Sequence, residues 1–270
     1  MKTDIVKITP EDAKKYLGKN YQKNRKLRSG VVSRYARDMK NGNWGITHQG
    51  IAFNTRGELI DGQHRLAAIV ECGEPITMMV VRDVSCASFS HLDLGFNRTT
   101  EDVLCAEGDD WVTRDHISIA RLLSANGNSR QSLAGLSPFE LKELVYLHRN
   151  AISFVLQSLE RRIRGVTVAP LLAAIASAYY AETDRVRLAE FIQVLVSGIV
   201  GNPETDGAAI LLRDFAKDNS SLFSTAARIE LYLKTQRAIK AFMKGERISR
   251  LYMPPGPLYV TKNYVTKNGI

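Results

Sequence analysis

Asp61-Gly62-Gln63-His64-Arg65-Leu66-Ala67 is the stretch that decides how the first third of this chain folds. It follows two short apolar segments, 51–53 and 59–60, and opens an apolar-periodic run that stops at Gly73. This pattern predicts a strand, a glycine turn and a helix with Gly73 as its C-cap. A glycine turn lets the backbone approach a ligand, and the first N–H groups of a helix have no partners within it. The stretch therefore predicts an anion site, with phosphate as the obvious ligand.

Three side chains of this turn are candidates for chemistry. Arg65 offers a planar fork of donors, and His64 is a titratable donor or base. Asp61 has two interpretations, since it could cap the helix or hold a magnesium ion that bridges phosphates. Capping needs no further ligand and is the simpler of the two. Ordinary capping chemistry would also explain the whole turn without any functional site.

The run from Asp61 to Ala68 resembles the signature of the ParB/sulfiredoxin superfamily. ParB proteins carry Gly-Glu-Arg-Arg at the corresponding turn, and sulfiredoxins carry Gly-Cys-His-Arg. A second stretch, 93–99, is similar to a segment of ParB-like proteins of phages and mobile elements, and the resemblance covers about residues 5–110. It implies a small mixed-sheet domain whose nucleotide or phosphate site is formed by Gly62, Gln63, His64, Arg65, Asp93 and Arg98.

Two departures limit what the resemblance implies. Gln63 stands where sulfiredoxins have their nucleophilic cysteine, so sulfinic acid reduction is excluded. His64 replaces the first of two ParB arginines, so specificity for cytidine triphosphate does not carry over. Some relatives with an Asp-Gly-x-His-Arg turn are nucleotide-dependent kinases or nucleases with ATPase activity. In an enzyme of that kind the catalytic residues would be Asp61, His64 and Arg65.

Length and composition describe an ordinary globular chain. Its 270 residues allow two modest domains, and apolar and charged contents of 44% and 24% are typical. No apolar run reaches membrane-spanning length and no signal peptide begins the chain, so we expect a cytoplasmic protein without a membrane partner. The three cysteines lack the short spacings of metal or redox sites, so we expect free thiols and no metal centre.

The charge is concentrated at the two ends of the chain. Residues 1–40 carry a balance of +8 and residues 234–270 of +7, which leaves about −6 for the middle of a chain whose total is +9. Within 20–28, amides and a tyrosine alternate with the basic residues Lys23, Arg25, Lys26 and Arg28. Such a composition suits contact with a DNA backbone. The alternative is a solvated basic face that aids solubility.

Periodicity predicts an α+β chain of two parts. We expect a mixed-sheet domain over 1–110, with a helix starting at Pro10, a second helix capped by Ser29, a hairpin over 51–60 and an interior strand over 76–81. An all-α domain should follow over 111–250, including helices at 167–181, 184–197, 207–217 and 222–244, and then an extended arm over 251–270. The pair 137–148 and 151–164, with Arg161, Arg162 and Arg164 at its end, is a weak match to a helix-turn-helix.

Three functions are compatible with these patterns. The preferred one is a DNA-associated protein with a ParB-like nucleotide or phosphate site at Asp61–Arg65 and basic ends on the DNA backbone. Its partners would be DNA and a nucleoside triphosphate of unknown base, with Mg²⁺ as a further cofactor and homodimer formation left open. The alternatives are a kinase or nuclease using the same pocket and a protein-binding module whose pocket is vestigial.

Overall fold

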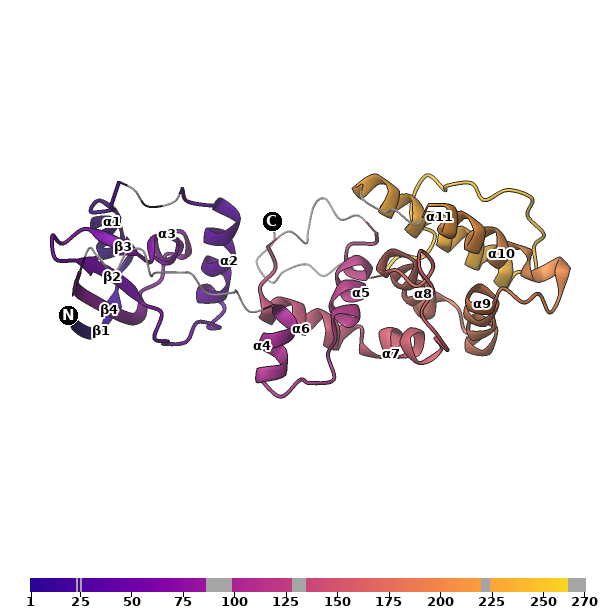
Figure 1. Ribbon diagram of the computed structural model, residues 1–270, viewed down its shortest axis with the longest axis horizontal. Coiled ribbons are helices and arrows are strands. Elements are labelled where there is room, and N and C mark those ends of the chain that lie inside the picture. Colours follow the sequence, from indigo (N-terminus) through magenta and orange to yellow (C-terminus); the bar gives the residue numbers. More distant parts are fainter. Residues whose placement is uncertain (23, 25, 86–98, 128–134, 220–223, 262–270) are drawn as a thin grey trace. The chain divides into compact units, whose positions relative to one another are not determined.

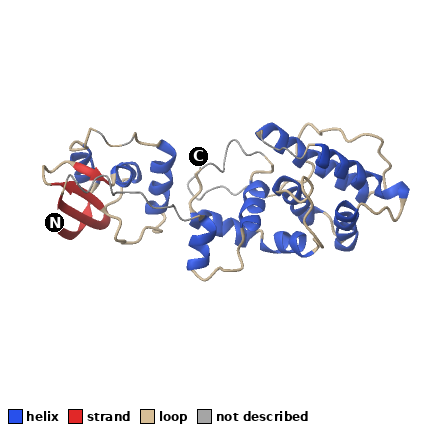
Figure 2. Cartoon of the chain, viewed as in Figure 1, coloured by secondary structure: helices blue, strands red, loops and turns tan. Residues whose placement is uncertain are grey.

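A computed structural model describes residues 1–22, 24, 26–85, 99–127, 135–219 and 224–261 (Figure 1). The chain divides into two compact units, one of residues 1–98 with 135–139 and one of residues 99–134 with 140–270. The first holds a sheet and helices, and the described part of the second holds helices alone (Figure 2). The predicted α+β class is confirmed. The observed division falls between residues 98 and 99, whereas the sequence pattern places it at 110.

The first unit is built on a four-stranded mixed sheet. Its strands are β1 (Lys2–Ile8), β2 (Ile51–Asn54), β3 (Leu59–Asp61) and β4 (Ile76–Val84), in the order β1-β4-β2-β3. β1 pairs with β4 and β2 with β3 in antiparallel fashion, whereas β2 and β4 are parallel. The predicted hairpin and the interior position of β4 are confirmed. β1 was not predicted, because most of its residues are exposed at the sheet edge and show no clean apolar alternation.

Three helices complete this unit: α1 (Pro10–Leu17), α2 (Ser29–Lys40) and α3 (Gln63–Cys72). α3 lies between the sheet and α2 and also packs against α1 (Figure 1). Thr9 and Asp12 form a reciprocal capping box at α1, which starts at Pro10 as predicted. The N-cap of α2 is Arg28, without a side-chain cap bond, and not the predicted Ser29. The shared core includes Ala13, Val32, Met39, Ile51, Phe53, Leu66, Ile69 and Val80.

The remaining helices begin at Thr100. They are α4 (Thr100–Ala106), α5 (Arg114–Ser124), α6 (Pro138–Leu147), α7 (Arg149–Gln157), α8 (Ala169–Ala181), α9 (Arg185–Ser197), α10 (Pro203–Asp218) and α11 (Thr225–Met243). α8 is the central helix, since residues 170–178 are all buried and it packs against α5, α7 and α11. A helix that is apolar on all sides belongs in the interior of a bundle. The four helices predicted beyond residue 166 are confirmed as α8, α9, α10 and α11, with shifted ends.

One expectation for the helical unit is wrong, and the structure adds contacts to another. α7 ends at Gln157, so Arg161, Arg162 and Arg164 do not lie on a recognition helix. The described part of the predicted surface arm is held against the bundle. The buried Gln236 side chain accepts from the Leu258 N–H at 2.8 Å and donates to the Tyr259 carbonyl at 2.8 Å. A backbone with two such bonds to a core side chain is anchored.

The described helices do not meet the requirements of a membrane span. None of them is both long and apolar enough to cross a bilayer.

Candidate functional site

The predicted strand, glycine turn and helix are present at the start of α3. Gly62 is the N-cap and has a left-handed backbone with φ of 93°, and Gly73 is the C-cap with φ of 77°. A Cβ atom on Gly62 would lie 2.4 Å from Cγ2 of Ile51 on β2. Two features of this position therefore require glycine: its positive φ angle and its close contact with the sheet. The close contact fixes the first turn of α3 against β2.

Asp61 is the last residue of β3, so it does not cap the helix as predicted. Its Oδ1 atom accepts from the N–H of Gly62 at 2.6 Å, and its Oδ2 atom lies 3.5 Å from Nη1 of Arg65. Both carboxylate oxygens already have partners in the chain. A magnesium ion on Asp61 would have to displace the Arg65 contact.

Arg65 is anchored beneath the turn. Its Nη1 atom donates to the carbonyl of Gly50 at 2.8 Å, and its side chain is only 16% exposed. Gly50 lies in close contact with the backbone of β4, because a Cβ atom on Gly50 would lie 1.8 Å from the carbonyl oxygen of Met79. Arg65 thus ties the entry of β2 to α3. The Arg65 guanidinium stays near the start of α3, but its Nη1 atom already donates to the Gly50 carbonyl.

Gln63 contacts the segment that precedes α2. Its Oε1 atom accepts from Nδ2 of Asn20 at 3.1 Å. The Asn24 amide donates to Oδ1 of Asn20 and to the carbonyl of Leu59, each at 2.8 Å. Asn20 also forms an isolated parallel bridge with Leu59 on β3. The described residues of 19–24 therefore run along β3 and reach the first turn of α3.

His64 contacts the end of the same segment. Its Nε2 atom accepts from the backbone N–H of Arg28 at 3.1 Å, and the residue is only 9% exposed. A ring nitrogen that accepts a hydrogen bond carries no proton, which assigns the neutral Nδ1–H tautomer. We call residues 19–28 the cover segment, because Asn20 binds Gln63 and Arg28 binds His64.

The structure places the remaining predicted site residues in three groups. Lys26 and Arg28 are exposed on the cover segment, and His48 is exposed on a loop. Lys23, Arg25, Asp93 and Arg98 lie outside the described residues.

The roles of Asn20 and Asn24 were not predicted. We interpreted their amides as phosphate contacts, but they bind Gln63 and the β3 backbone. Sequence spacing did not reveal these contacts, because Gln63 is 43 residues from Asn20 and Leu59 is 35 residues from Asn24.

In the helical unit, His148 has a structural role. Its ring nitrogens lie 3.1 Å from the Ser124 hydroxyl and 2.9 Å from the Tyr180 hydroxyl. Burial lowers the pKa of His148 to about 4, so the ring is neutral at physiological pH. Ser124 is itself buried, which separates this histidine–serine pair from any substrate in solution.

Comparison of the chain with models of protein families, with curated proteins and with solved structures finds no match in any of the three. The function is therefore inferred from the chain itself.

Proposed function

We propose that this chain is a DNA-associated protein whose first unit binds a nucleotide phosphate at the start of α3. The observation that best supports this proposal is the position of the cover segment. It reaches the helix start through Asn20 and Arg28, and it also bears exposed basic side chains at Lys26 and Arg28. One segment thus links the predicted phosphate site to the predicted DNA contacts.

The start of α3 supports anion binding for two reasons. A helix N-terminus carries a partial positive charge, and its first N–H groups have no partners within the helix. The guanidinium of Arg65 lies beside this turn, where the Asp61 carboxylate at 3.5 Å offsets part of its positive charge. Gln63 and His64 are buried and are bound by Asn20 and Arg28 of the cover segment, so we expect a phosphate to reach this turn only when the segment moves away. Nucleotide binding and the position of the basic segment are then coupled.

The same contacts favour binding over catalysis. A general base needs a nitrogen or oxygen that can take a proton from substrate. Nε2 of His64 already accepts from Arg28, and both oxygens of Asp61 have partners. The kinase and nuclease alternatives would require those contacts to break before the reaction. The protein-binding alternative predicts that neither nucleotide nor DNA binds.

Amide NMR tests the nucleotide part of the proposal. ATP, GTP and CTP would each be titrated with Mg²⁺ while backbone shifts are recorded. We expect the largest shifts at residues 62–65 and at Arg28, whose N–H must leave His64. Gly73, at the opposite end of α3, should shift little. Shifts spread evenly over the unit, or none with any nucleotide, would overturn the nucleotide site.

A variant of the cover segment sharpens the test. Asn20→Ala removes the side-chain bonds to Gln63 and from Asn24, so the open state becomes more populated. One hydrogen bond of about 1 kcal/mol corresponds to about a fivefold population change, so nucleotide should bind up to about fivefold tighter. Gln22→Ala is the control, because Gln22 is an exposed neighbour in the same segment. Weaker binding in Asn20→Ala alone would show that the segment forms part of the site and does not block it.

DNA binding is tested by its dependence on salt. Anisotropy of a labelled duplex should give a log affinity that falls linearly with log salt concentration, because bound Lys and Arg release counterions. Addition of the nucleotide should tighten DNA binding if both act through the cover segment. Absence of duplex binding at low salt would remove the DNA part and leave the nucleotide part standing.

A further inference from the structure

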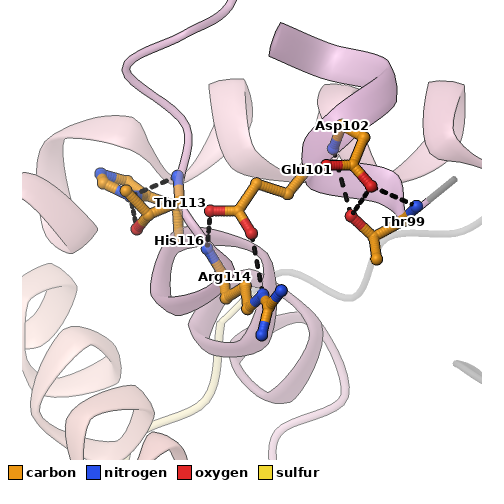
Figure 3. A network of polar contacts seen from close by, with 6 residues as sticks. All are labelled: Thr99, Glu101, Asp102, Thr113, Arg114 and His116. Carbon is orange, nitrogen blue, oxygen red and sulfur yellow. Dashed lines mark hydrogen bonds and ion pairs between the residues drawn. The ribbon is translucent and has the colours of Figure 1, made fainter.

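A second polar site lies in the helical unit, away from any residue used above. An open hollow of about 250 Å³ is formed by α4, α5 and the residue before α4. Apart from one isoleucine, its lining is polar: Thr99, Thr100, Ser118, Glu101, Arg114 and Arg121. Figure 3 shows three residues of this lining, Thr99, Glu101 and Arg114, with their polar contacts.

The acidic group of the hollow is already neutralised. Glu101 accepts from Nε of Arg114 at 2.9 Å and from the Arg114 backbone N–H at 3.3 Å (Figure 3). Thr99 is likewise engaged, because it forms a capping box with Asp102 at the start of α4. After these pairings Arg121 supplies the remaining charge of the lining.

Arg121 is an unusual cation for a surface hollow. Its Nε atom is buried and has no hydrogen-bond partner among the residues that the structure describes. Burial of the guanidinium also lowers the pKa of Arg121. A buried guanidinium nitrogen that has no hydrogen-bond partner costs free energy. A counter-ion beside the same delocalised guanidinium would offset this cost, since attraction is stronger where water is partly excluded.

We propose that this hollow binds a phosphate-type oxyanion, with Arg121 as its main cation and the hydroxyls of Thr100 and Ser118 as neutral donors. Arginine suits this ligand because its planar fork matches the spacing of phosphate oxygens. Hydroxyl groups donate to the remaining oxygens. The site is independent of the α3 site, and its test can fail while that site stands.

Arginine side-chain NMR of the full chain provides the test. Inorganic phosphate would be titrated while the Nε–H resonances are recorded. We expect one resonance to shift saturably and to be absent in Arg121→Gln. Phosphate binding should weaken about tenfold or more in that variant, the usual size for removal of a charged hydrogen-bond partner. Arg185→Gln is the matched control, because Arg185 also has a buried guanidinium nitrogen without a partner in the described residues.

A second variant tests the same site in case the Arg121→Gln protein does not fold. Thr100→Val combined with Ser118→Ala keeps the charge and removes two donors, and it should weaken phosphate binding several-fold. A short DNA duplex then identifies the source of the phosphate. Displacement of inorganic phosphate by duplex assigns the site to a backbone phosphate, and failure to displace assigns it to a small ligand. No saturable Nε–H shift, or equal binding by wild type and the folded variants, would overturn the proposal.

Discussion

The backbone N–H of Arg28 donates to Nε2 of His64 at 3.1 Å, joining the residue before α2 to the first turn of α3. This bond holds the end of the cover segment over the helix start. It also fixes which nitrogen of His64 carries the proton, because an accepting nitrogen has none. His64 therefore has a structural role in the closed state, whatever role it takes when the segment moves.

His64→Ala should loosen the cover segment. Removal of the acceptor leaves the Arg28 N–H without this partner, so we expect a cost of about 1–3 kcal/mol in the free energy of unfolding. Denaturant unfolding measures the cost, and hydrogen exchange of the Arg28 amide should become faster. His48→Ala is the control, since His48 is exposed. An unchanged exchange rate at Arg28 would contradict the observed contact.

Gly62→Ala should cost far more than Gly73→Ala. Both glycines cap α3 with positive φ, so an alanine is strained at either position, by roughly 1–2 kcal/mol. Only at Gly62 would the new Cβ meet another side chain, with Ile51 Cγ2 at 2.4 Å, whereas nothing lies within 4 Å at Gly73. Thermal unfolding gives a melting temperature for each variant, and the difference between the two measures the cost of the contact with Ile51. Equal melting temperatures would show that α3 can move away from β2 without cost.

The sequence predicted the local geometry of this region well. A short apolar segment, a glycine and a three-and-four apolar spacing set the bounds of β2, β3 and α3, because each signal depends on neighbouring residues only. The capping role of Asp61 failed because Gly62 takes the N-cap and the carboxylate pairs with Arg65, four residues further along. A contact between residues four apart thus accompanies a helix start that differs by one residue from the predicted one.

The contacts of the site could not be predicted in the same way. His64 and Arg28 are separated by 36 residues, and Gln63 and Asn20 by 43. A single sequence carries no periodic signal for such pairs. Composition identified the cover segment as basic and polar, but composition cannot distinguish an amide that binds phosphate from one that binds its own backbone.

Stability should fall as the pH drops below about 6.5. The folded pKa of His148 is about 4, below its ordinary value of 6.5, so the unfolded chain binds a proton first. The contribution of this neutral histidine is thus fully present above pH 6.5 and is lost as pH falls toward 4, by up to about 1.4 kcal/mol per pH unit. His116 acts in the same direction, since burial lowers its pKa as well. Urea unfolding at pH 7, 6 and 5 measures the decrease.

His148→Gln provides the control for this pH dependence. Glutamine does not titrate, and its amide can still donate and accept next to Ser124 and Tyr180. The variant should be less stable at pH 7 and should lose less stability between pH 7 and pH 5. A slope equal to that of wild type would assign the effect to His116 or to the carboxyl groups.

Arg65→Ala should destabilise the first unit, contrary to the behaviour of a purely ligand-facing residue. It removes the donor to Gly50 and the partner of Asp61, and we expect a decrease of about 1–3 kcal/mol in the free energy of unfolding. Asp61→Asn removes only the ion pair and should cost less. Denaturant unfolding of the two variants measures the difference. An Arg65→Ala protein as stable as wild type would leave the residue available for ligand alone.

The last prediction concerns the basic side chains of the cover segment. We would replace Lys23, Arg25, Lys26 and Arg28 together by glutamine. If they bind the DNA backbone, all duplex sequences should bind more weakly by a similar factor, and the salt slope should fall by roughly one unit for each phosphate that is no longer bound. Nucleotide affinity should survive, because the side-chain change leaves the Arg28 backbone N–H on His64.

Lys2→Gln with Lys7→Gln controls for general charge, since both lysines are exposed on β1 in the same unit. The double variant should retain most of the DNA affinity and keep its salt slope, because a specific contact and not net charge carries the effect. If the quadruple variant instead fails to bind nucleotide and still binds DNA, its basic side chains bind the nucleotide phosphates at α3. The cover segment would then close over a bound ligand, and the DNA contacts would have to lie elsewhere in the chain.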